Sequence, residues 1–247
     1  MKATPAIQLR LLDVQAVDTA RNQLTHRRNN LPELAELERL NAEVSDAEGS
    51  LEQFRERVGD LDKQIRALEF EVETVQARAQ RDKSRMDSGA ISSPRELESM
   101  QHEVQTLAAK QGELEDRELE IMEQRDAVDV DLSAAAQRFQ QLRGEYYATI
   151  ERRNAALAEI DVEDSRREAE RTKLVAELPA DLLELYERLR ASNGGVGASA
   201  LRAKRCQGCQ LELFGTALAE LKAAPEDEVV RCDECGRILI RTPESGL

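Results

Sequence analysis

The sequence contains no tryptophan, and aromatic residues make up only 3% of its 247 positions. Charged residues, by contrast, make up 34%. A large globular core needs many bulky apolar side chains, so this composition excludes one and favours a narrow hydrophobic seam between helices. We therefore expect a mostly α-helical protein.

Long apolar stretches are also absent. The first five residues are followed by a mixed polar and apolar pattern, which contains neither a secretion signal nor a membrane span. Cysteine does not occur before position 206, and the four cysteines form two close pairs rather than a disulfide framework. These features predict a cytoplasmic protein with no membrane partner.

Positive charge is in deficit. The chain has 35 Lys and Arg residues against 49 Asp and Glu residues, a formal net charge of -14. Most of this negative charge falls in the helical part of the sequence. An acidic helical surface repels phosphates, which excludes non-specific nucleic-acid binding along the helices.

Two long stretches repeat apolar residues at alternating steps of three and four, which is the pattern of a coiled-coil seam. In the first stretch the seam residues are Leu37, Leu40, Val44, Ala47, Leu51, Phe54, Val58, Leu61, Ile65, Leu68, Val72, Val75 and Ala79. In the second they are Leu97, Met100, Val104, Leu107, Leu114, Ile121, Val128, Leu132, Ala135, Phe139, Leu142 and Tyr146, with Gln111, Glu118 and Arg125 as polar interruptions.

The two stretches have similar lengths on either side of a turn near residues 86–95, which predicts the tip of a helical hairpin. Ser92 and Ser93 precede Pro94, a residue suited to the first helical position, and Glu96 completes a capping-box pattern with Ser93. We expect the arms to pair antiparallel within one chain, so that opposite residue numbers sum to roughly 180. Pairing between two chains is the alternative, so a monomer is expected but a dimer stays open.

The remaining boundaries follow from breaker residues. The hairpin is predicted to occupy residues 1–191, with a break at Pro32 and a short basal helix at 180–191. The glycine-rich stretch 192–198 reads as a linker. Residues 199–247 are predicted to form a small zinc ribbon.

The ribbon prediction depends on Cys206, Cys209, Cys232 and Cys235, which form two Cys-x-x-Cys pairs. Two such pairs supply four thiolates to one tetrahedral zinc ion. Four thiolates complete the coordination of zinc and leave no position for a reactive water, so we expect one structural zinc ion. A rubredoxin-like iron centre and redox-active disulfides use similar pairs and remain alternatives.

A family resemblance depends on Ser93–Met100 at the expected tip, on Leu185–Leu189 before the ribbon, and on the two Cys-x-x-Cys pairs, which we call the knuckles. The resemblance of the second knuckle extends to Leu239. With them, the chain resembles the bacterial C4-type zinc-ribbon proteins that have a long amino-terminal coiled-coil hairpin. That resemblance implies an adaptor or regulatory protein. In some bacteria such proteins bind the enhancer-dependent sigma factor, a link to transcription regulation, or secretion and flagellar components. Residues 210–213 lack the His-Met and double proline common in the family, so no specific partner is carried over.

Two functions follow as hypotheses. The first is a non-enzymatic adaptor that binds proteins through the hairpin and the ribbon, because the chain has only two histidines and no nucleophile motif. The second is a regulator that binds RNA or DNA through the ribbon. Its candidate contacts are Arg202, Lys204, Arg205, Arg237 and Arg241.

Overall fold

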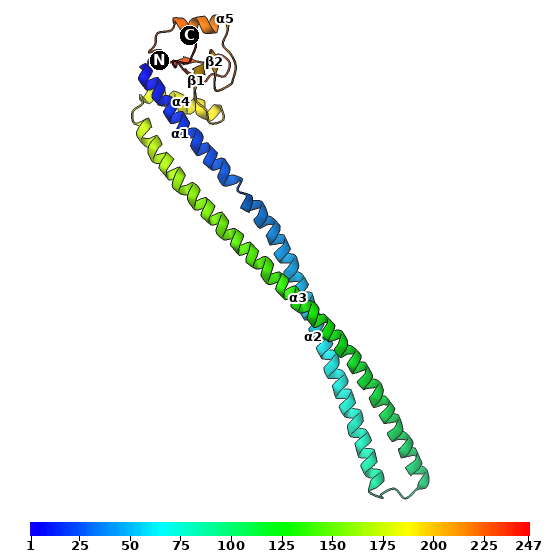
Figure 1. The fold of residues 1–247 in the computed structure, drawn as a ribbon. Coiled ribbons are helices and arrows are strands. Elements are labelled where there is room, and N and C mark those ends of the chain that lie inside the picture. Colours follow the sequence, from blue (N-terminus) through cyan, green and yellow to red (C-terminus); the bar gives the residue numbers. More distant parts are fainter. The chain divides into compact units, whose positions relative to one another are not determined.

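The computed structural model describes all 247 residues and confirms a mostly helical fold, with a long antiparallel helical hairpin followed by a small strand region (Figure 1). The helices are α1 (Pro5–Asn29), α2 (Pro32–Asp87), α3 (Pro94–Val175), α4 (Ala180–Ser192) and α5 (Gly215–Ala223), and the strands are β1 (Ala198–Arg202), β2 (Arg205–Cys206), β3 (Val230–Arg231) and β4 (Ile238–Ile240). None of the helices combines the length and apolar character that a membrane span requires.

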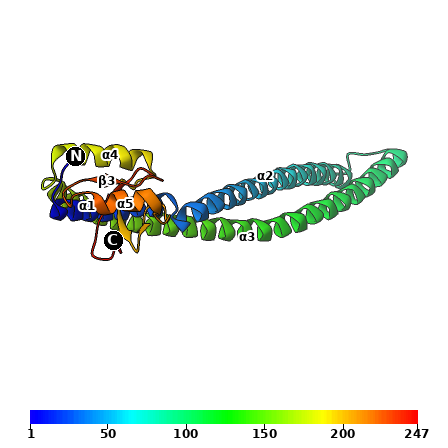
Figure 2. The ribbon, with the colours of Figure 1, turned by 90° about the horizontal axis from the view of Figure 1, so that it is seen from above.

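The chain divides into two compact units, which we call the base unit (residues 1–34 and 151–247) and the distal unit (residues 35–150). The distal unit consists of α2 and the first part of α3, which run antiparallel and are joined by a turn (Figures 1 and 2). The fold explains why a chain with so few aromatic residues can be stable. It buries one narrow seam in the distal unit and a small mixed core in the base unit.

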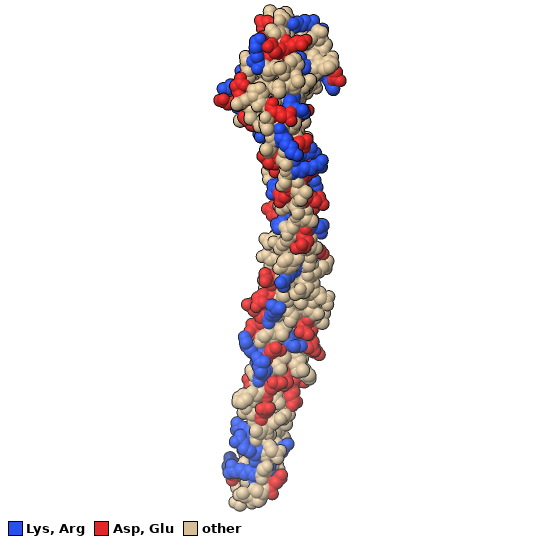
Figure 3. All heavy atoms as spheres, turned by 90° about the vertical axis from the view of Figure 1, so that its left-hand side faces the viewer, with Lys and Arg blue, Asp and Glu red and all other residues tan.

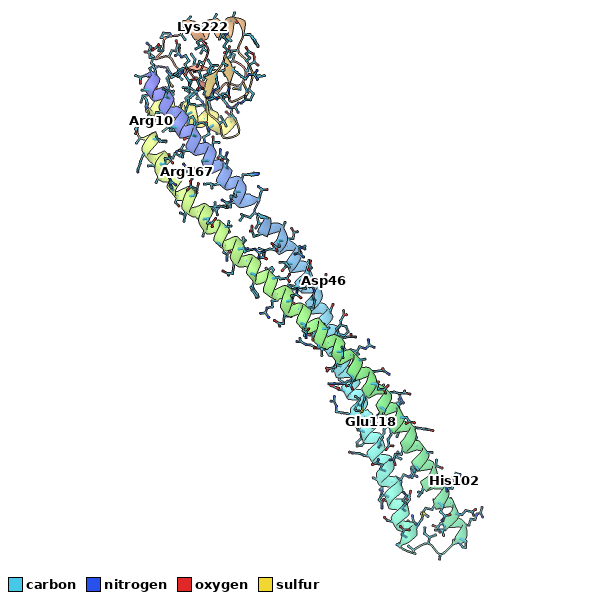
Figure 4. All side chains as sticks on the ribbon, in the orientation of Figure 1. Arg10, Asp46, His102, Glu118, Arg167 and Lys222 are labelled. Atoms are coloured by element: carbon cyan, nitrogen blue, oxygen red, sulfur yellow. The ribbon has the colours of Figure 1, made fainter.

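Contacts across the distal unit follow the predicted intrachain register. Ion pairs join Arg78 to Glu103 and, at 3.6 Å, Arg138 to Glu43, so that in both cases the residue numbers sum to about the expected value. Glu118, one of the polar interruptions of the heptad pattern, lies on α3 (Figure 4). The buried seam residues come from the heptad positions. They are Leu37, Leu40, Leu51, Leu61, Leu68, Val72 and Ala79 on α2, and Leu114, Val128 and Leu142 on α3.

A charged residue interrupts this seam at Arg125, and its side chain is balanced by acidic neighbours. Its guanidinium lies 3.4 Å from the carboxylate of Asp62 on the opposite helix and 3.9 Å from that of Asp129. The attraction of Asp129 is the main cause that raises the pKa of Arg125. The cross-hairpin pair with Asp62 gives this position a partner in only one register.

The turn comprises residues 88–93, and α3 begins at Pro94. The capping box predicted at this point is not formed. Ser93 contributes only its backbone carbonyl, which accepts a hydrogen bond from the Leu97 N–H at 3.1 Å. The Glu96 carboxylate lies 4.0 Å from the Arg85 guanidinium, because the hairpin brings an opposite charge next to it.

The base unit is built on α1, whose end was predicted from the break at Pro32. The Thr4 hydroxyl accepts the hydrogen bond of the Ile7 N–H at 3.4 Å, and Pro5 occupies the first helical position. The helix ends at Asn29, and α2 begins at Pro32. Proline cannot donate the hydrogen bond that a continuous helix requires, so the chain breaks there.

The strands form one sheet in the order β2-β1-β4-β3. Strands β1 and β4 are parallel, and the other neighbours are antiparallel. One face of this sheet shares a hydrophobic core with α1 and α4. Its buried residues are Ala3, Leu11, Val14, Leu178, Leu182, Tyr186, Leu189, Ala198, Ile238 and Ile240.

The glycine-rich stretch 192–198, predicted as a linker, joins α4 to β1 and packs against the shared core. A Cβ atom on Gly197 would lie 2.6 Å from the Tyr186 carbonyl oxygen, so residues 192–198, which we call the glycine loop, pack directly on α4. Gln15 of α1, which is buried, accepts hydrogen bonds from the N–H groups of Gly197 (2.8 Å) and Ala198 (3.3 Å). It also donates to the Gly195 carbonyl at 3.1 Å. The glycines let the chain fit closely against two helices.

A second buried side chain of α1, Asp18, connects three helices. Its carboxylate accepts hydrogen bonds from Arg171 Nε of α3 and from the Tyr186 hydroxyl of α4, each at 2.7 Å. Arg190 Nε lies 3.3 Å away, an ion-pair distance without hydrogen-bond alignment. Burial, followed by the bond to Asp18, raises the pKa of Tyr186 well above its usual range, so the hydroxyl stays protonated and donates.

Replacing Tyr186 with phenylalanine tests this connection. Tyr186→Phe keeps the ring and removes one donor to a buried carboxylate, so we expect a loss of about 1–3 kcal/mol in the free energy of unfolding. Urea unfolding followed by circular dichroism measures it. Tyr147→Phe is the matched control, because that ring is 53% exposed. Equal stability of both variants would show that the Asp18 network contributes little.

Candidate metal centre

The four cysteines converge at the ends of two short strands. Cys206 closes β2 and begins the first knuckle, and Cys232 follows β3 and begins the second. Strands β1 and β4, which are parallel neighbours, separate β2 from β3 in the sheet. The sheet therefore brings together two knuckles that lie far apart in the sequence.

Both knuckles are tight turns of the same form. The N–H of Gln210 donates to the Cys206 carbonyl at 2.8 Å, and the N–H of Gly236 donates to the Cys232 carbonyl at 2.7 Å. The residue after each second cysteine has a left-handed backbone, with φ of 63° at Gln210 and 72° at Gly236. Glycine suits this conformation in the second knuckle, whereas the first tolerates glutamine.

The sulfur atoms are spaced for one four-coordinate ion. All four lie within 4.8 Å of one another, and the Cys206–Cys235 and Cys209–Cys232 pairs are each 3.9 Å apart. A tetrahedral zinc ion with bonds of about 2.3 Å separates its sulfurs by about 3.8 Å. A disulfide needs only about 2.05 Å, and the four thiols are free. The donor set and its spacing thus fit zinc.

The four thiols differ in electrostatic environment. Burial is the main cause that raises the pKa of Cys232 to about 12, and it also raises the pKa of Cys209. Burial acts in the same direction on Cys235, but hydrogen bonds from Arg237 and from neighbouring thiols outweigh it and lower the pKa to about 7. Metal binding requires thiolates, so the lowered pKa of Cys235 favours the form that binds a metal.

Arg237 follows the second knuckle and fixes it to the rest of the base unit. Its Nε donates to the Val196 carbonyl at 3.0 Å and its Nη2 to the Asn193 carbonyl at 2.9 Å. The same side chain lies against the first knuckle, because a Cβ on Gly208 would be 2.7 Å from Arg237 Cδ. Gly208 is thus needed for this close approach and not for a left-handed backbone. Arg237 contacts both knuckles and the glycine loop.

The structure separates the five basic residues named as possible nucleic-acid contacts into engaged and free side chains. Arg237 is engaged as described, and Arg241 donates to four backbone carbonyls, those of Ala224, Pro225, Glu226 and Glu228. Arg202 forms an ion pair with Glu244. Lys204 and Arg205 make no ion pair and lie at the β1–β2 turn, where Ala203 and Lys204 both have positive φ. These last two are the side chains available to a ligand.

Comparisons with known proteins agree with this geometry. The model of the CT398-like coiled coil hairpin domain matches residues 14–194, and that of the C4-type zinc ribbon domain matches residues 205–239. The chain belongs to the CT398-like coiled-coil hairpin family. The resemblance found in the sequence is therefore confirmed, and so are its coiled coil and its zinc ribbon.

Full-length relatives share this arrangement. An uncharacterized protein of Mycobacterium tuberculosis is 38% identical over 241 residues, 98% of each chain, and one of Mycobacterium leprae is 30% identical over 222 residues, 90% of this chain and 95% of the relative. A solved structure from Mycobacterium smegmatis has a TM-score of 0.87 and 35% identity, covering 98% of this chain and 100% of the other. CT398 from Chlamydia trachomatis, at 18% identity and a TM-score of 0.68 over 96% and 98% of the chains, shares the fold.

Sequence reasoning missed two residues of α1 that bind the backbone of the strand region and its loops. Gln8 donates to the carbonyls of Ala3 and Glu226, and Gln15 binds the glycine loop. The available signal was two glutamines seven residues apart on the same helix face as Leu11 and Val14. A polar side chain at such a position is buried with partners that periodicity does not reveal.

We predict one zinc ion per chain, bound by all four cysteines. Metal analysis of the purified protein measures the stoichiometry, and Cys232→Ser should lower it because three thiolates no longer complete the tetrahedron. Chelation should leave the helical signal of the distal unit intact, since its seam contains no metal ligand. Iron as the main metal, or full zinc content in the variant, would contradict the assignment.

Arg237 should tune metal affinity without being a ligand. Arg237→Ala removes both carbonyl bonds and the contact with Gly208, so we expect zinc affinity to fall by about tenfold in a chelator competition. Arg237→Lys should not restore it, because an ammonium cannot reproduce the two directed bonds of the guanidinium. Arg205→Ala is the control, as Arg205 makes no ion pair. Unchanged affinity in Arg237→Ala would exclude a positioning role.

Proposed function

We propose that the protein is a non-enzymatic adaptor that binds protein partners through the distal unit and the ribbon. One observation carries the proposal: the four thiol sulfurs lie within 4.8 Å of one another, so that they would fill the coordination of a single ion and leave no position for a substrate or a reactive water. A zinc ion in this site would have a structural role. It would hold together two knuckles that the small ribbon core does not fix alone.

The surface of the distal unit supports this proposal. Only one seam is buried, so most of each helix faces solvent. Large apolar side chains are among the exposed residues, including Phe70 at 70% and Val130 at 69%. Exposed apolar side chains amid charged ones suit contacts with another protein.

Binding of RNA or DNA through the ribbon is the second candidate. Lys204 and Arg205 favour it, because both are free of ion pairs and lie together at one turn. Arg237 and Arg241 offer little to a phosphate while they hold backbone carbonyls. Contacts this few would give weak binding that depends steeply on salt.

Location and assembly form part of the same proposal. Four free thiols suit a reducing compartment, so we place the protein in the cytoplasm. Antiparallel pairing within one chain covers the seam that a second chain would otherwise cover. A monomer is accordingly sufficient for the fold.

Capture of partners from native cell extract tests the proposal. We expect nuclease treatment to leave protein partners bound to the full chain, and we expect substitutions at the turn and in the ribbon to reduce capture separately. Lys204→Glu/Arg205→Glu should affect any nucleic-acid binding and lower its log–log salt slope by about 0.7 to 0.9 per lost phosphate contact. Complete loss of capture after nuclease treatment would favour the second candidate.

A further inference from the structure

Basic residues gather at the end of the distal unit although the protein is acidic. Between residues 76 and 95 there are five Arg or Lys residues and two Asp residues, in a chain with a net charge of -14. Figure 3 shows basic atoms gathered toward this end of the hairpin. We call these five residues the basic tip surface: Arg78, Arg81, Lys83, Arg85 and Arg95.

Three members of the basic tip surface are available to a ligand. Arg78 pairs with Glu103, and Arg85 is 4.0 Å from Glu96. Arg81, Lys83 and Arg95 form no ion pair, and all are exposed. Arg81 uses only its Nε, to bond the carbonyl of its own helix at Ala77. The charges that remain unpaired therefore face solvent on both sides of the turn.

The hydrophobic seam is open at the same end. No residue between Ala79 and Leu114 is buried, although α3 has the heptad residues Leu97, Met100, Val104 and Leu107 in this stretch. Met86, Ile91, Leu97 and Met100 are only half-buried. An open groove of about 530 Å³ lies on this part of the hairpin, and its lining is mostly polar, with Glu73, Gln76, Gln80, Lys83 and Gln111 beside Ala77 and Ala79. Apolar side chains without full cover thus lie beside unpaired positive charge.

We propose that the basic tip surface binds an acidic amphipathic segment of a partner protein. Carboxylates of the segment would pair with Arg81, Lys83 and Arg95, and its apolar face would cover the open seam around Ile91. This inference rests on the proposed adaptor function, because it names the chemistry of one partner surface. It adds that recognition at the turn is driven by charge.

The observations favour a protein over a nucleic acid. Asp82, Asp87, Glu96 and Glu98 are interspersed with the basic residues. A continuous phosphate chain cannot avoid these carboxylates, whereas a protein segment can place its own carboxylates only opposite Arg81, Lys83 and Arg95. No aromatic residue occurs between Phe70 and Phe139, so the turn has no platform for stacking bases. A partner with separate carboxylates and an apolar face matches the mixed character of this surface.

The test uses the full chain and a defined probe. The probe is a fluorescent helical peptide with glutamate on one face and leucine on the other, and binding is followed by fluorescence anisotropy. The variant is Arg81→Glu/Lys83→Glu. The matched control is Arg57→Glu/Arg66→Glu, which changes the charge of the same helix equally at exposed positions away from the turn. Circular dichroism confirms that both variants keep the helical content of the wild type.

We expect the variant at the turn to weaken peptide binding by about tenfold or more and the control to have a much smaller effect, with binding also weakening as salt screens the charges. Ile91→Ser should weaken binding by a smaller factor. Equal losses in both charge variants, or no binding at low salt, would overturn the proposal. So would tighter binding of a single-stranded RNA oligonucleotide at the turn, or self-association that the variant abolishes while peptide binding persists. Failure here would leave nuclease-resistant partner capture, and hence the adaptor function, standing.

Discussion

The base unit depends on one buried negative charge, that of Asp18. Moving a carboxylate out of water costs several kcal/mol unless opposite charges and hydrogen bonds replace the lost hydration. Arg171 and Tyr186 supply those bonds from two other helices, and Arg190 adds a further positive charge. A hydrophobic contact would tolerate small shifts between helices, but a buried carboxylate does not. The network therefore fixes where α4 lies, and with it the loop that leads into the ribbon.

Hydrogen bonds to the backbone of the glycine loop connect this network to the metal centre. Gln15 holds the glycine loop from the α1 side, and Arg237 holds the same loop from the side of the second knuckle. Gly197 and Gly208 let these contacts form, because any larger residue would meet Tyr186 or Arg237. We therefore expect metal binding to be coupled to packing of the base unit, because free energy gained at the thiols would also stabilise the loop. The ribbon is part of a folded base and not a free appendage.

The sequence predicted those features that repeat or that depend on spacing. The heptad spacing predicts the seam residues without knowledge of the tertiary fold. Two Cys-x-x-Cys pairs indicate either a metal site or disulfides. The capping box predicted at Ser93 does not form, and the Glu96 carboxylate instead lies 4.0 Å from Arg85 of the other helix. The engagement of Arg237 and Arg241 was not predictable in the same way. Their partners are backbone carbonyls brought close only by the tertiary fold, and carbonyls have no sequence signature.

Charged residues of the distal unit differ in whether they form ion pairs between the two helices or are free to bind another molecule. At Arg125 the guanidinium is matched by Asp62 across the seam, so that its charge specifies register. Near the turn the seam is no longer buried, and unmatched charge there costs little stability because water solvates it. Selection for folding alone would not require such a surplus in an otherwise acidic chain. The same residues that contribute least to holding the hairpin together are thus the ones most free to contact something else.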